Sequence, residues 1–380
     1  MAPVRLTQLT ARRLWIAAQR LDRAEPFGRG PAATAACVKH LGYVQIDTIH
    51  VIERSHHHIL FSRIPRYQRS DLAAAQSLEK TVFEYWTHAL AYVSALDYRF
   101  FVRHMRSHQG APQAWYTGVT EQQMRRMLAR IERDGPLTMR DIDDDVLVEK
   151  DHAWASRKPS KRVLQLAFYR GYLTISQRVG MLKTYELSKR HFGWTRPPRA
   201  ATTAECDAYV LERALRSQGL VSLDSVCHLE PSRKPAVAKL IERRIGKKTL
   251  VPVEIAGAER VPHWAAPELL EQKPAREPAV THLLSPFDPL VIQRKRLALF
   301  FDYQHRFEAY VPREKRIYGY FALPVLVGDR ISAVIDLKTD RAARKLLIQN
   351  WTWLPGAKSA DVKRRIEAAL EPFEHFQLAH

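Results

Sequence analysis

The sequence predicts an α+β protein, mainly α-helical, made of tandem winged helix-turn-helix domains followed by a C-terminal β-rich α/β region. Two internal similarities support this prediction. Residues 135–142, Gly-Pro-Leu-Thr-Met-Arg-Asp-Ile, are similar to residues 219–226, Gly-Leu-Val-Ser-Leu-Asp-Ser-Val, and an amphipathic helical pattern precedes each segment. Residues 42–47, Gly-Tyr-Val-Gln-Ile-Asp, are similar to residues 171–176, Gly-Tyr-Leu-Thr-Ile-Ser. Because three helices followed by a β-hairpin make a winged helix-turn-helix, these repeats indicate three copies of that unit.

The elements of each copy follow from apolar periodicity, helix caps and turn residues. In the first copy, helical periodicity covers residues 10–21 and 32–41, and the extended segment 42–47 follows. In the middle copy, a helix ends at Gly135, Thr138 can cap a second, a third spans 160–169, and a hairpin joins 172–176 to 181–187. In the third copy, Thr202 and Glu205 offer a capping box, Ser222 can cap the second helix, a third runs from Pro235 to Gly246, and a strand covers 250–255.

The segments outside the three copies have patterns of their own. Residues 70–118 are expected to be a helical insertion, and the proline-bearing stretch 257–281 is expected to be a linker. In the last segment we expect a hairpin of 318–327 with 331–337 around Gly328-Asp329, then helices at 340–350 and 360–370. The expected domains are winged helices at 1–69, 119–200 and 201–256, with the C-terminal region at 282–380.

Composition points to a polyanionic partner. The 380 residues carry 60 Lys and Arg against 40 Asp and Glu, a formal net charge of +20. Such an excess favours nucleic acid, since phosphate contacts release counterions, although acidic membranes also attract basic chains. Three scattered cysteines, Cys37, Cys206 and Cys227, give no disulfide framework, and there is no apolar run long enough for a signal peptide or a membrane span. We therefore expect a cytoplasmic, nucleoid-associated protein. The motifs GxxxxGK[ST], GxGxxG, GxSxG and HExxH are absent.

The repeat also marks a candidate catalytic pair. Where the middle copy has Thr174 and Ser176, the first copy has Gln45 and Asp47. Residues two apart in an extended segment point to the same face, so an amide and a carboxylate would stand side by side. An amide can orient a water, and a carboxylate can deprotonate it or stabilise adjacent positive charge. The alternative is a solvated strand face or a local hydrogen bond.

Two further stretches are candidates for DNA contact. In the run from Arg54 to Arg63, two histidines could share a strand face, but no acidic or Cys partner stands at a ligand-like spacing, so we expect no metal and no cofactor. Contacts to phosphate or base, or ordinary core and surface histidines, fit this run better. The predicted helix 160–169 places cations and an amide on one side, as a recognition helix does; an ordinary solvated face would look similar. The candidate DNA-binding residues are Arg54, His56, His57, His58, Arg63, Lys161, Arg162, Gln165 and Tyr169.

Several motifs together resemble one protein family. They are Tyr43-Val44-Gln45-Ile46-Asp47-Thr48-Ile49, Arg54-Ser55-His56-His57-His58, Phe83-Glu84-Tyr85-Trp86, Leu284-Ser285-Pro286-Phe287-Asp288-Pro289-Leu290 and Tyr318-Gly319-Tyr320. The chain resembles the YcaQ-like DNA glycosylases, the winged-helix AlkZ/AlkX group, over nearly its whole length. One departure is Ala89, which follows Trp86-Thr87-His88 where many relatives have Glu; this puts the substrate range in doubt.

The resemblance implies excision of N-alkylated purines and unhooking of interstrand crosslinks by a Gln-apolar-Gln or Gln-apolar-Asp motif. Gln45 and Asp47 match the Asp form, which resembles the crosslink-unhooking branch. We then expect a monomeric, monofunctional glycosylase that leaves an abasic site in double-stranded DNA, with Asp47 stabilising an oxocarbenium-like sugar and activating a water that Gln45 holds. The alternatives are a non-catalytic winged-helix transcriptional regulator and a structural nucleoid protein.

Overall fold

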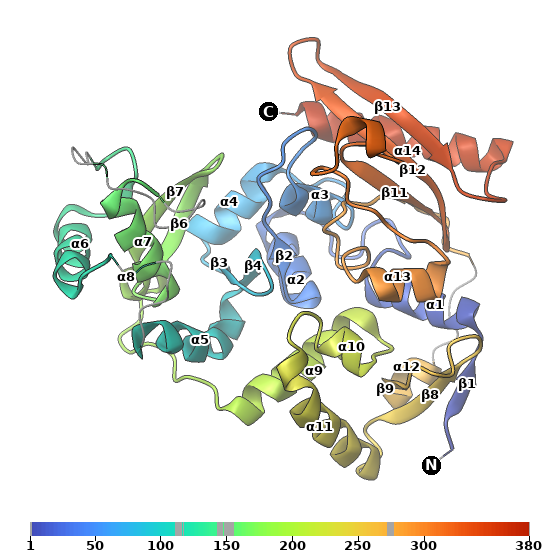
Figure 1. The fold of residues 1–380 in the computed structure, drawn as a ribbon, viewed down its shortest axis with the longest axis horizontal. Helices are drawn as coiled ribbons and strands as arrows, with labels where there is room; N and C mark the ends of the chain where they lie inside the picture. Colours follow the sequence, from blue (N-terminus) through green and yellow to red (C-terminus); the bar gives the residue numbers. More distant parts are fainter. Residues whose placement is uncertain are drawn as a thin grey trace. The chain divides into compact units, whose positions relative to one another are not determined.

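The computed structural model describes residues 2–110, 116, 118–142, 147, 156–271 and 277–379 (Figure 1). The chain forms two compact units. Unit 1 contains Met1–Tyr67, His88–Leu90 and Asp207–His380, and unit 2 contains Gln68–Thr87 and Ala91–Cys206. Helices and strands both contribute, with helix in excess, so the expected α+β class dominated by helix is confirmed. No described helix combines the length and the apolarity needed to cross a membrane.

The first two helices of unit 1 are the two that the sequence predicts. Helix α1 (Gln8–Ala18) starts where the Thr7 side chain accepts the N–H of Thr10, and it buries Leu14 and Trp15. Helix α2 (Gly30–Leu41) ends at Gly42, which has a φ of 82°. Strand β2 (Val44–Gln45) follows directly. The short α3 (Ser55–Phe61) comes after a loop.

The third predicted copy keeps its helix order. Helix α9 (Thr203–Gln218) carries the expected capping box, since Thr202 and Glu205 exchange hydrogen bonds of 2.7 and 3.2 Å between side chain and backbone. Ser222 caps α10 (Leu223–Val226), and α11 (Lys234–Gly246) has a proline in its first turn. Strand β8 (Val251–Ile255) pairs in parallel with β1 (Val4–Leu6) and antiparallel with β9 (His263–Ala265).

Part of the predicted linker 257–281 is therefore ordered structure. Strand β9 pairs with β8, its His263 and Ala265 are buried, and α12 (Pro267–Glu271) follows. The prolines of this segment flank the strand instead of breaking it: Pro262 precedes β9 and Pro267 opens α12.

The C-terminal part of unit 1 is an antiparallel sheet. Its order is β10 (Thr281–Leu283), β11 (Ala322–Val327), β12 (Arg330–Asp340) and β13 (Lys345–Trp353). The predicted hairpin around Gly328-Asp329 is confirmed. Helix α13 (Arg294–Phe301) lies between β10 and β11 in the chain, and α14 (Ala360–Leu378) packs against the sheet (Figure 1). Its buried side chains include Ile366, and the rings of Phe373 and Phe376 contact Phe61 at the end of α3.

The prediction of a helix at 340–350 is wrong. Those residues turn and return as β13, which pairs with β12 from Asp340 opposite Lys345 to Ala333 opposite Trp353. The run Ala-Ala-Arg-Lys-Leu-Leu has high helix propensity, but the backbone pairing offered by β12 outweighs that weak local preference.

Unit 2 holds the middle copy. Helix α6 (Glu121–Asp134) ends at Gly135, and α7 (Pro159–Tyr169) leads into the predicted hairpin of β6 (Leu173–Val179) and β7 (Leu182–Leu187). Strand β5 (Leu137–Thr138) joins this sheet beside β7. Thr138 therefore lies in a strand and bonds to the Asp141 carboxylate instead of capping a helix. The short helix α8 (Ser188–Phe192) follows β7.

The segment predicted as a helical insertion is only partly helical. It contains α4 (Arg69–Ser77) and α5 (Tyr98–Gly110), but between them β3 (Val82–Trp86) and β4 (Leu90–Ser94) form adjacent strands. Their burial explains the error: almost every residue of both strands is buried, so the alternating polar pattern that marks a half-exposed strand is missing.

Candidate active site

The Gln45 side chain is buried and its amide is held by an imidazole. Gln45 is 7% exposed, and its Oε1 lies 3.0 Å from Nε2 of His88. A carboxamide oxygen only accepts, so His88 donates from Nε2, and the amide –NH2 is the donor that Gln45 can offer a ligand. The backbone here is fixed from both sides: the Gln45 carbonyl accepts from Ser55 Oγ at 3.1 Å, and the Ile46 N–H donates to the Leu90 carbonyl at 2.8 Å.

Asp47 follows the strand instead of continuing it. Strand β2 ends at Gln45, so the expectation that both side chains share one strand face is not met. The local hydrogen bond considered as the alternative is present: Asp47 Oδ1 accepts the Ile49 N–H at 2.8 Å. Burial nevertheless raises the pKa of Asp47, although hydrogen bonds from the Ile49 and Thr48 N–H groups oppose the shift. The carboxylate is thus a partly desolvated base in a fixed orientation.

The loop that carries Asp47 is anchored to the C-terminal sheet and its helix. The Thr339 N–H donates to the Val51 carbonyl at 2.9 Å. The Glu53 N–H donates to Oε1 of Gln377 on α14 at 2.6 Å. Residues from opposite ends of unit 1 therefore define the path of the chain after Asp47.

His88 lies in an aromatic and cationic surrounding. Its ring meets the Tyr43 ring edge-on at 4.8 Å and the His228 ring at 6.2 Å, and the Arg213 guanidinium lies 5.7 Å from the Tyr43 ring centre. Burial, together with the charges of His228 and Arg213, lowers the pKa of His88 to about 4. His88 is therefore neutral at pH 7.

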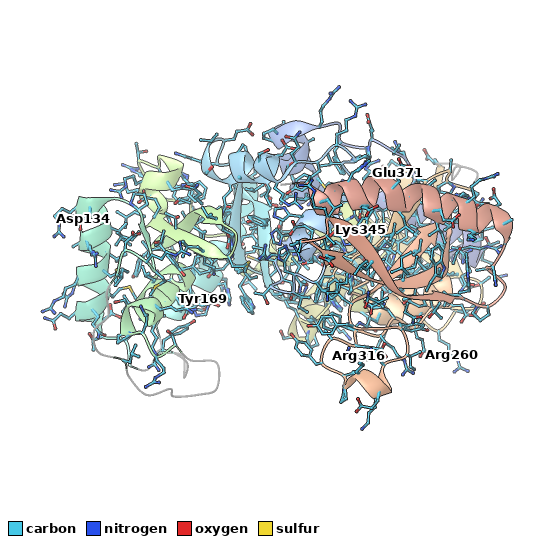
Figure 2. All side chains as sticks on the ribbon, turned by 90° about the horizontal axis from the view of Figure 1, so that it is seen from above. Asp134, Tyr169, Arg260, Arg316, Lys345 and Glu371 are labelled. Carbon is cyan, nitrogen blue, oxygen red and sulfur yellow. The ribbon has the colours of Figure 1, made fainter. Side chains whose placement is uncertain are left out.

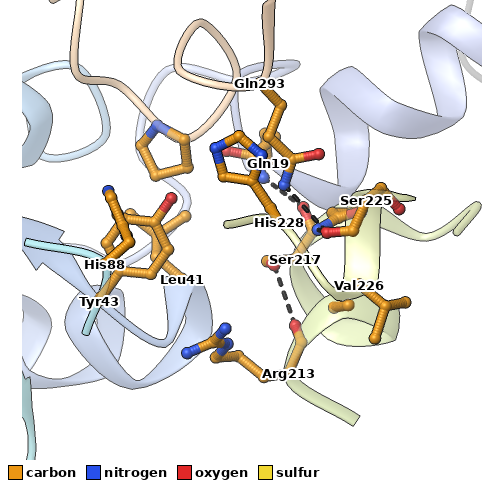
Figure 3. A pocket seen from close by; sticks show the side chains of 13 residues that line it. Gln19, Leu41, Tyr43, His88, Arg213, Ser217, Ser225, Val226, His228 and Gln293 are labelled. Carbon is orange, nitrogen blue, oxygen red and sulfur yellow. Dashed lines mark hydrogen bonds between the residues drawn. The ribbon is translucent and has the colours of Figure 1, made fainter. Parts of the chain in front are cut away.

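These side chains line a small cavity. Figure 3 shows His88, Tyr43 and Leu41 on one side and Ser217, Ser225 and Val226 on the other. Its volume of about 30 Å³ is enough for water but not for a base. Gly42 makes the close packing possible, because a Cβ there would lie 2.2 Å from Cδ of Arg213.

Sequence reasoning did not identify His88, Arg213 or His228 as part of the site. His88 belongs to the Trp86-Thr87-His88 triplet, which the sequence marks only as a motif. Its partner Gln45 is 43 residues away, and nothing in either segment predicts the contact.

The histidine run forms a helix, so the expected strand face is wrong. On α3, His56 is 4% exposed and His58 is fully buried, with Nε2 of His58 2.7 Å from the Leu283 carbonyl. Neither can reach DNA in this fold. His57 is half-buried with Nδ1 2.6 Å from the Tyr67 hydroxyl, and Arg54 is partly exposed. Among the described residues no cluster of His, Cys, Asp and Glu could hold a metal.

Arg63 is a structural residue, contrary to its assignment as a DNA contact. Its side chain is completely buried and forms a two-pronged ion pair with Asp288, at 2.7 and 3.0 Å. Its Nε donates to the Gln19 carbonyl at 2.9 Å. The pair connects the end of α3 to the Ser-Pro-Phe-Asp-Pro motif and leaves no donor for phosphate.

Helix α7 of unit 2 presents only part of its predicted DNA-facing side. Lys161 is exposed and Gln165 is half-exposed. Arg162 is 6% exposed and its Nε donates to the Ser156 carbonyl at 2.8 Å, so its assignment as a DNA contact is wrong. Tyr169 is half-buried, with its ring 5.8 Å from that of Tyr116.

Comparison with known proteins relates this architecture to one family. The family described as DNA glycosylase AlkZ-like matches residues 38–376, which include Gln45, Asp47 and His88. In three dimensions the chain is similar to the DNA glycosylase AlkZ of Streptomyces sahachiroi, with a TM-score of 0.64 at 17% sequence identity. That similarity extends over 98% of this chain and 97% of the other, so the two proteins share a fold throughout.

Proposed function

The chain belongs to the AlkZ-like DNA glycosylase family and is a DNA glycosylase, and we propose that it hydrolyses the N-glycosidic bond of N7-alkylated purines in double-stranded DNA. The proposed substrates include purines joined in interstrand crosslinks. The product would be an abasic site, since the reaction uses water and no amine nucleophile.

One observation supports this assignment above all. A buried amide, Gln45, is oriented by a neutral imidazole, and two residues further on stands Asp47, a carboxylate whose pKa burial raises. An oriented –NH2 group and a partly desolvated carboxylate are what water activation beside a developing cation requires.

The chemistry follows from the charge of the substrate. A purine alkylated at N7 is cationic, so breaking the bond from C1′ to N9 returns the electron pair to the ring and neutralises it. The sugar becomes oxocarbenium-like, and the Asp47 carboxylate stabilises that charge. Gln45 donates to the oxygen of a water, Asp47 accepts one of its protons, and the remaining hydroxyl completes the bond to C1′.

Crosslink unhooking fits the partial exposure of the carboxylate. A base that is covalently tied to the opposite strand cannot be withdrawn completely into an enclosed pocket. Asp47 is half-buried and the neighbouring cavity is too small for a base, so the bond would be cleaved at an open site.

We also propose that the helices and hairpins act as winged helices on the duplex. In unit 2 the order α6, β5, α7, β6, β7 matches that layout, with Lys161 and Gln165 accessible on α7. In unit 1, Arg54 and His57 are the accessible members of the basic run near the Asp47 loop.

The direct test is excision. The protein would be incubated with a duplex containing one N7-methylguanine and then heated in alkali, which cuts the strand at each abasic site. The proposal requires cleavage at that base by the wild-type protein and its loss in Asp47→Asn. Absence of cleavage by a folded, DNA-binding wild-type protein would contradict it.

A further inference from the structure

A long loop of unit 1 carries the most exposed large hydrophobic side chain in the described part of the chain. The loop, residues 302–321, joins α13 to β11, and we call it the Tyr310 loop. Tyr310 is 85% exposed, compared with 77% for Leu78. Figure 2 labels Arg316 on the part of this loop that projects from the body of unit 1. An irregular segment of this length in a compact unit generally has a functional role.

Two buried carboxylates hold the base of the loop. Glu308 accepts the N–H groups of Ile317, Tyr318 and Gly319 at 2.9, 2.7 and 3.2 Å. Asp336 of β12 accepts the next two, those of Tyr320 and Phe321, at 2.8 and 3.0 Å. Burial opposes ionisation of Glu308, but the three N–H donors outweigh it and lower its pKa. Five consecutive backbone donors are thus satisfied by two anions, which makes this stretch rigid.

Gly319 shows how closely the Asp336 carboxylate approaches the backbone of the loop. Its φ is 135°, and a Cβ at this position would lie 2.1 Å from Oδ2 of Asp336. Only glycine fits both the backbone conformation and the space. The conformational entropy of this base of the loop is therefore lost on folding, before any ligand binds.

The exposed face of the loop is cationic. Four basic residues accompany Tyr310, three of them exposed and one half-buried, and the exposed acids of this loop are Glu314 and, at its start, Asp302. The basic residues are Arg306, Arg313, Lys315 and Arg316. Arg316 is itself fixed, since its Nε donates to the Val311 carbonyl at 2.8 Å and its guanidinium lies 5.1 Å from the Tyr320 ring. Arg313 and Lys315 lie on a single helical turn, and neither forms a salt bridge within the described part of the chain.

We propose that the Tyr310 loop is a DNA-binding surface in which Tyr310 stacks on a base exposed at an interrupted step, while Arg313 and Lys315 contact the flanking phosphates. The proposal takes from the proposed function only that DNA is the partner. An exposed aromatic ring on a loop that carries cations matches an unstacked base between phosphates, because the ring supplies a stacking surface and the cations neutralise the backbone. A glycosylase creates such a step when it removes a base, so the surface fits the substrate under attack and the product.

The test compares two duplexes of one sequence, one intact and one with a tetrahydrofuran abasic analogue, which the enzyme cannot process. Tyr310→Ala should weaken binding to the abasic duplex by roughly tenfold, as removal of one stacking ring does, and binding to the intact duplex by clearly less. Tyr310→Phe keeps the ring and should bind as the wild type does. Neither variant should change the slope of affinity with salt.

The double variant Arg313→Glu, Lys315→Glu should weaken binding to both duplexes and reduce the salt slope by about one unit for each phosphate that the protein no longer neutralises. Lys247→Glu, an exposed cation at the end of α11, is the control for the change in charge.

Two results would overturn the proposal: equal affinities for Tyr310→Ala and wild type, or an equal loss on the intact and abasic duplexes, each with unchanged thermal unfolding. Excision by the wild-type protein is measured on the same preparations. A protein that shows the Tyr310 effect without excision contradicts the proposed reaction alone, and one that excises without the effect contradicts the loop alone.

Discussion

The imidazole of His88 donates a hydrogen bond to the side-chain oxygen of Gln45 across 3.0 Å. This bond fixes which end of the amide is available, since a carboxamide whose oxygen is occupied presents its nitrogen. Burial of His88 keeps its imidazole neutral at pH 7. A neutral imidazole can donate this bond from one nitrogen without placing a second positive charge beside the cationic alkylated purine.

Asp47→Asn should lower the single-turnover rate of N7-methylguanine excision by roughly 100-fold or more, because it removes both the charge and the base. Gln45→Ala should lower the rate less, because the amide only orients water. DNA affinity should persist, since removing an acid cannot weaken attraction to phosphate.

The repeat supplies matched controls for these variants. Thr174→Ala and Ser176→Ala occupy the corresponding positions of the middle copy and should keep wild-type rates. If the middle-copy variants lose as much activity as the first-copy variants, the catalytic assignment fails.

His88→Ala should slow excision by roughly tenfold to 100-fold, because a misplaced water-binding group costs about that much. His88→Gln places an –NH2 donor near the position of Nε2 and should restore much of the rate. A general loss of packing would not be rescued in this way.

The coupling between His88 and Gln45 can be tested further in a double-mutant cycle. If His88 acts through Gln45, then His88→Ala should have little further effect in a Gln45→Ala background. Additive losses would show that the two residues act independently.

The excision rate should fall on acidification at a higher pH than an exposed aspartate would require, because burial raises the pKa of Asp47 and the reaction needs its ionised form.

The contribution of Asp47 to the free energy of unfolding changes with pH in the opposite direction to the excision rate. A carboxyl whose folded pKa is raised binds its proton more tightly in the native state, so its stabilising contribution is present at low pH and is lost as the pH rises through that pKa.

Asp47→Asn should therefore unfold at the same temperature as the wild type or a higher one at pH 8, while it loses activity. Thermal melting beside a pH–rate profile measures both effects. A clear fall in melting temperature at pH 8 would contradict the desolvation argument.

Arg63→Met should destabilise the fold by about 3–5 kcal/mol, because it leaves the Asp288 carboxylate buried without its partner. Arg364→Met removes an exposed ion pair with Asp361 and should cost at most about 1 kcal/mol. Denaturant unfolding compares the two. Comparable costs, or a specific loss of DNA affinity in a fully stable Arg63→Met, would reject the structural role of Arg63.

The sequence predicted most elements that have local signals. The box of Thr202 with Glu205 and the cap at Ser222 depend on residues three apart, so the local sequence indicates them directly. Strand β13 could not be predicted, since its residues favour a helix and only the neighbouring strand decides otherwise. The strand predicted for the histidine run was wrong for a related reason, because seven residues are too few to distinguish a short helix from a strand.

The residues of the candidate site likewise differ in how far the sequence could predict them. Comparison of two repeats made Gln45 and Asp47 candidates, because an amide and a carboxylate stand where the middle copy has Thr174 and Ser176. The resemblance to the glycosylase family then assigned them the catalytic roles. His88 was beyond reach, since it meets Gln45 only after the intervening 43 residues have folded. Arg63 was misassigned because a basic residue beside histidines looks like a surface group until Asp288, far along the chain, is seen to pair with it.

The hydrogen bonds from Thr339 and Gln377 to the loop after Asp47 have a consequence for synthesis of the chain. Gln45, Asp47 and His88 all belong to the first 88 residues to be synthesised, yet the loop beside them acquires its last anchors only when α14 has been made. A nascent chain, or one cut short by a nonsense mutation before α14, would contain every proposed catalytic group and still lack their arrangement. We therefore expect base excision to require α14, although none of the proposed catalytic groups lies on it.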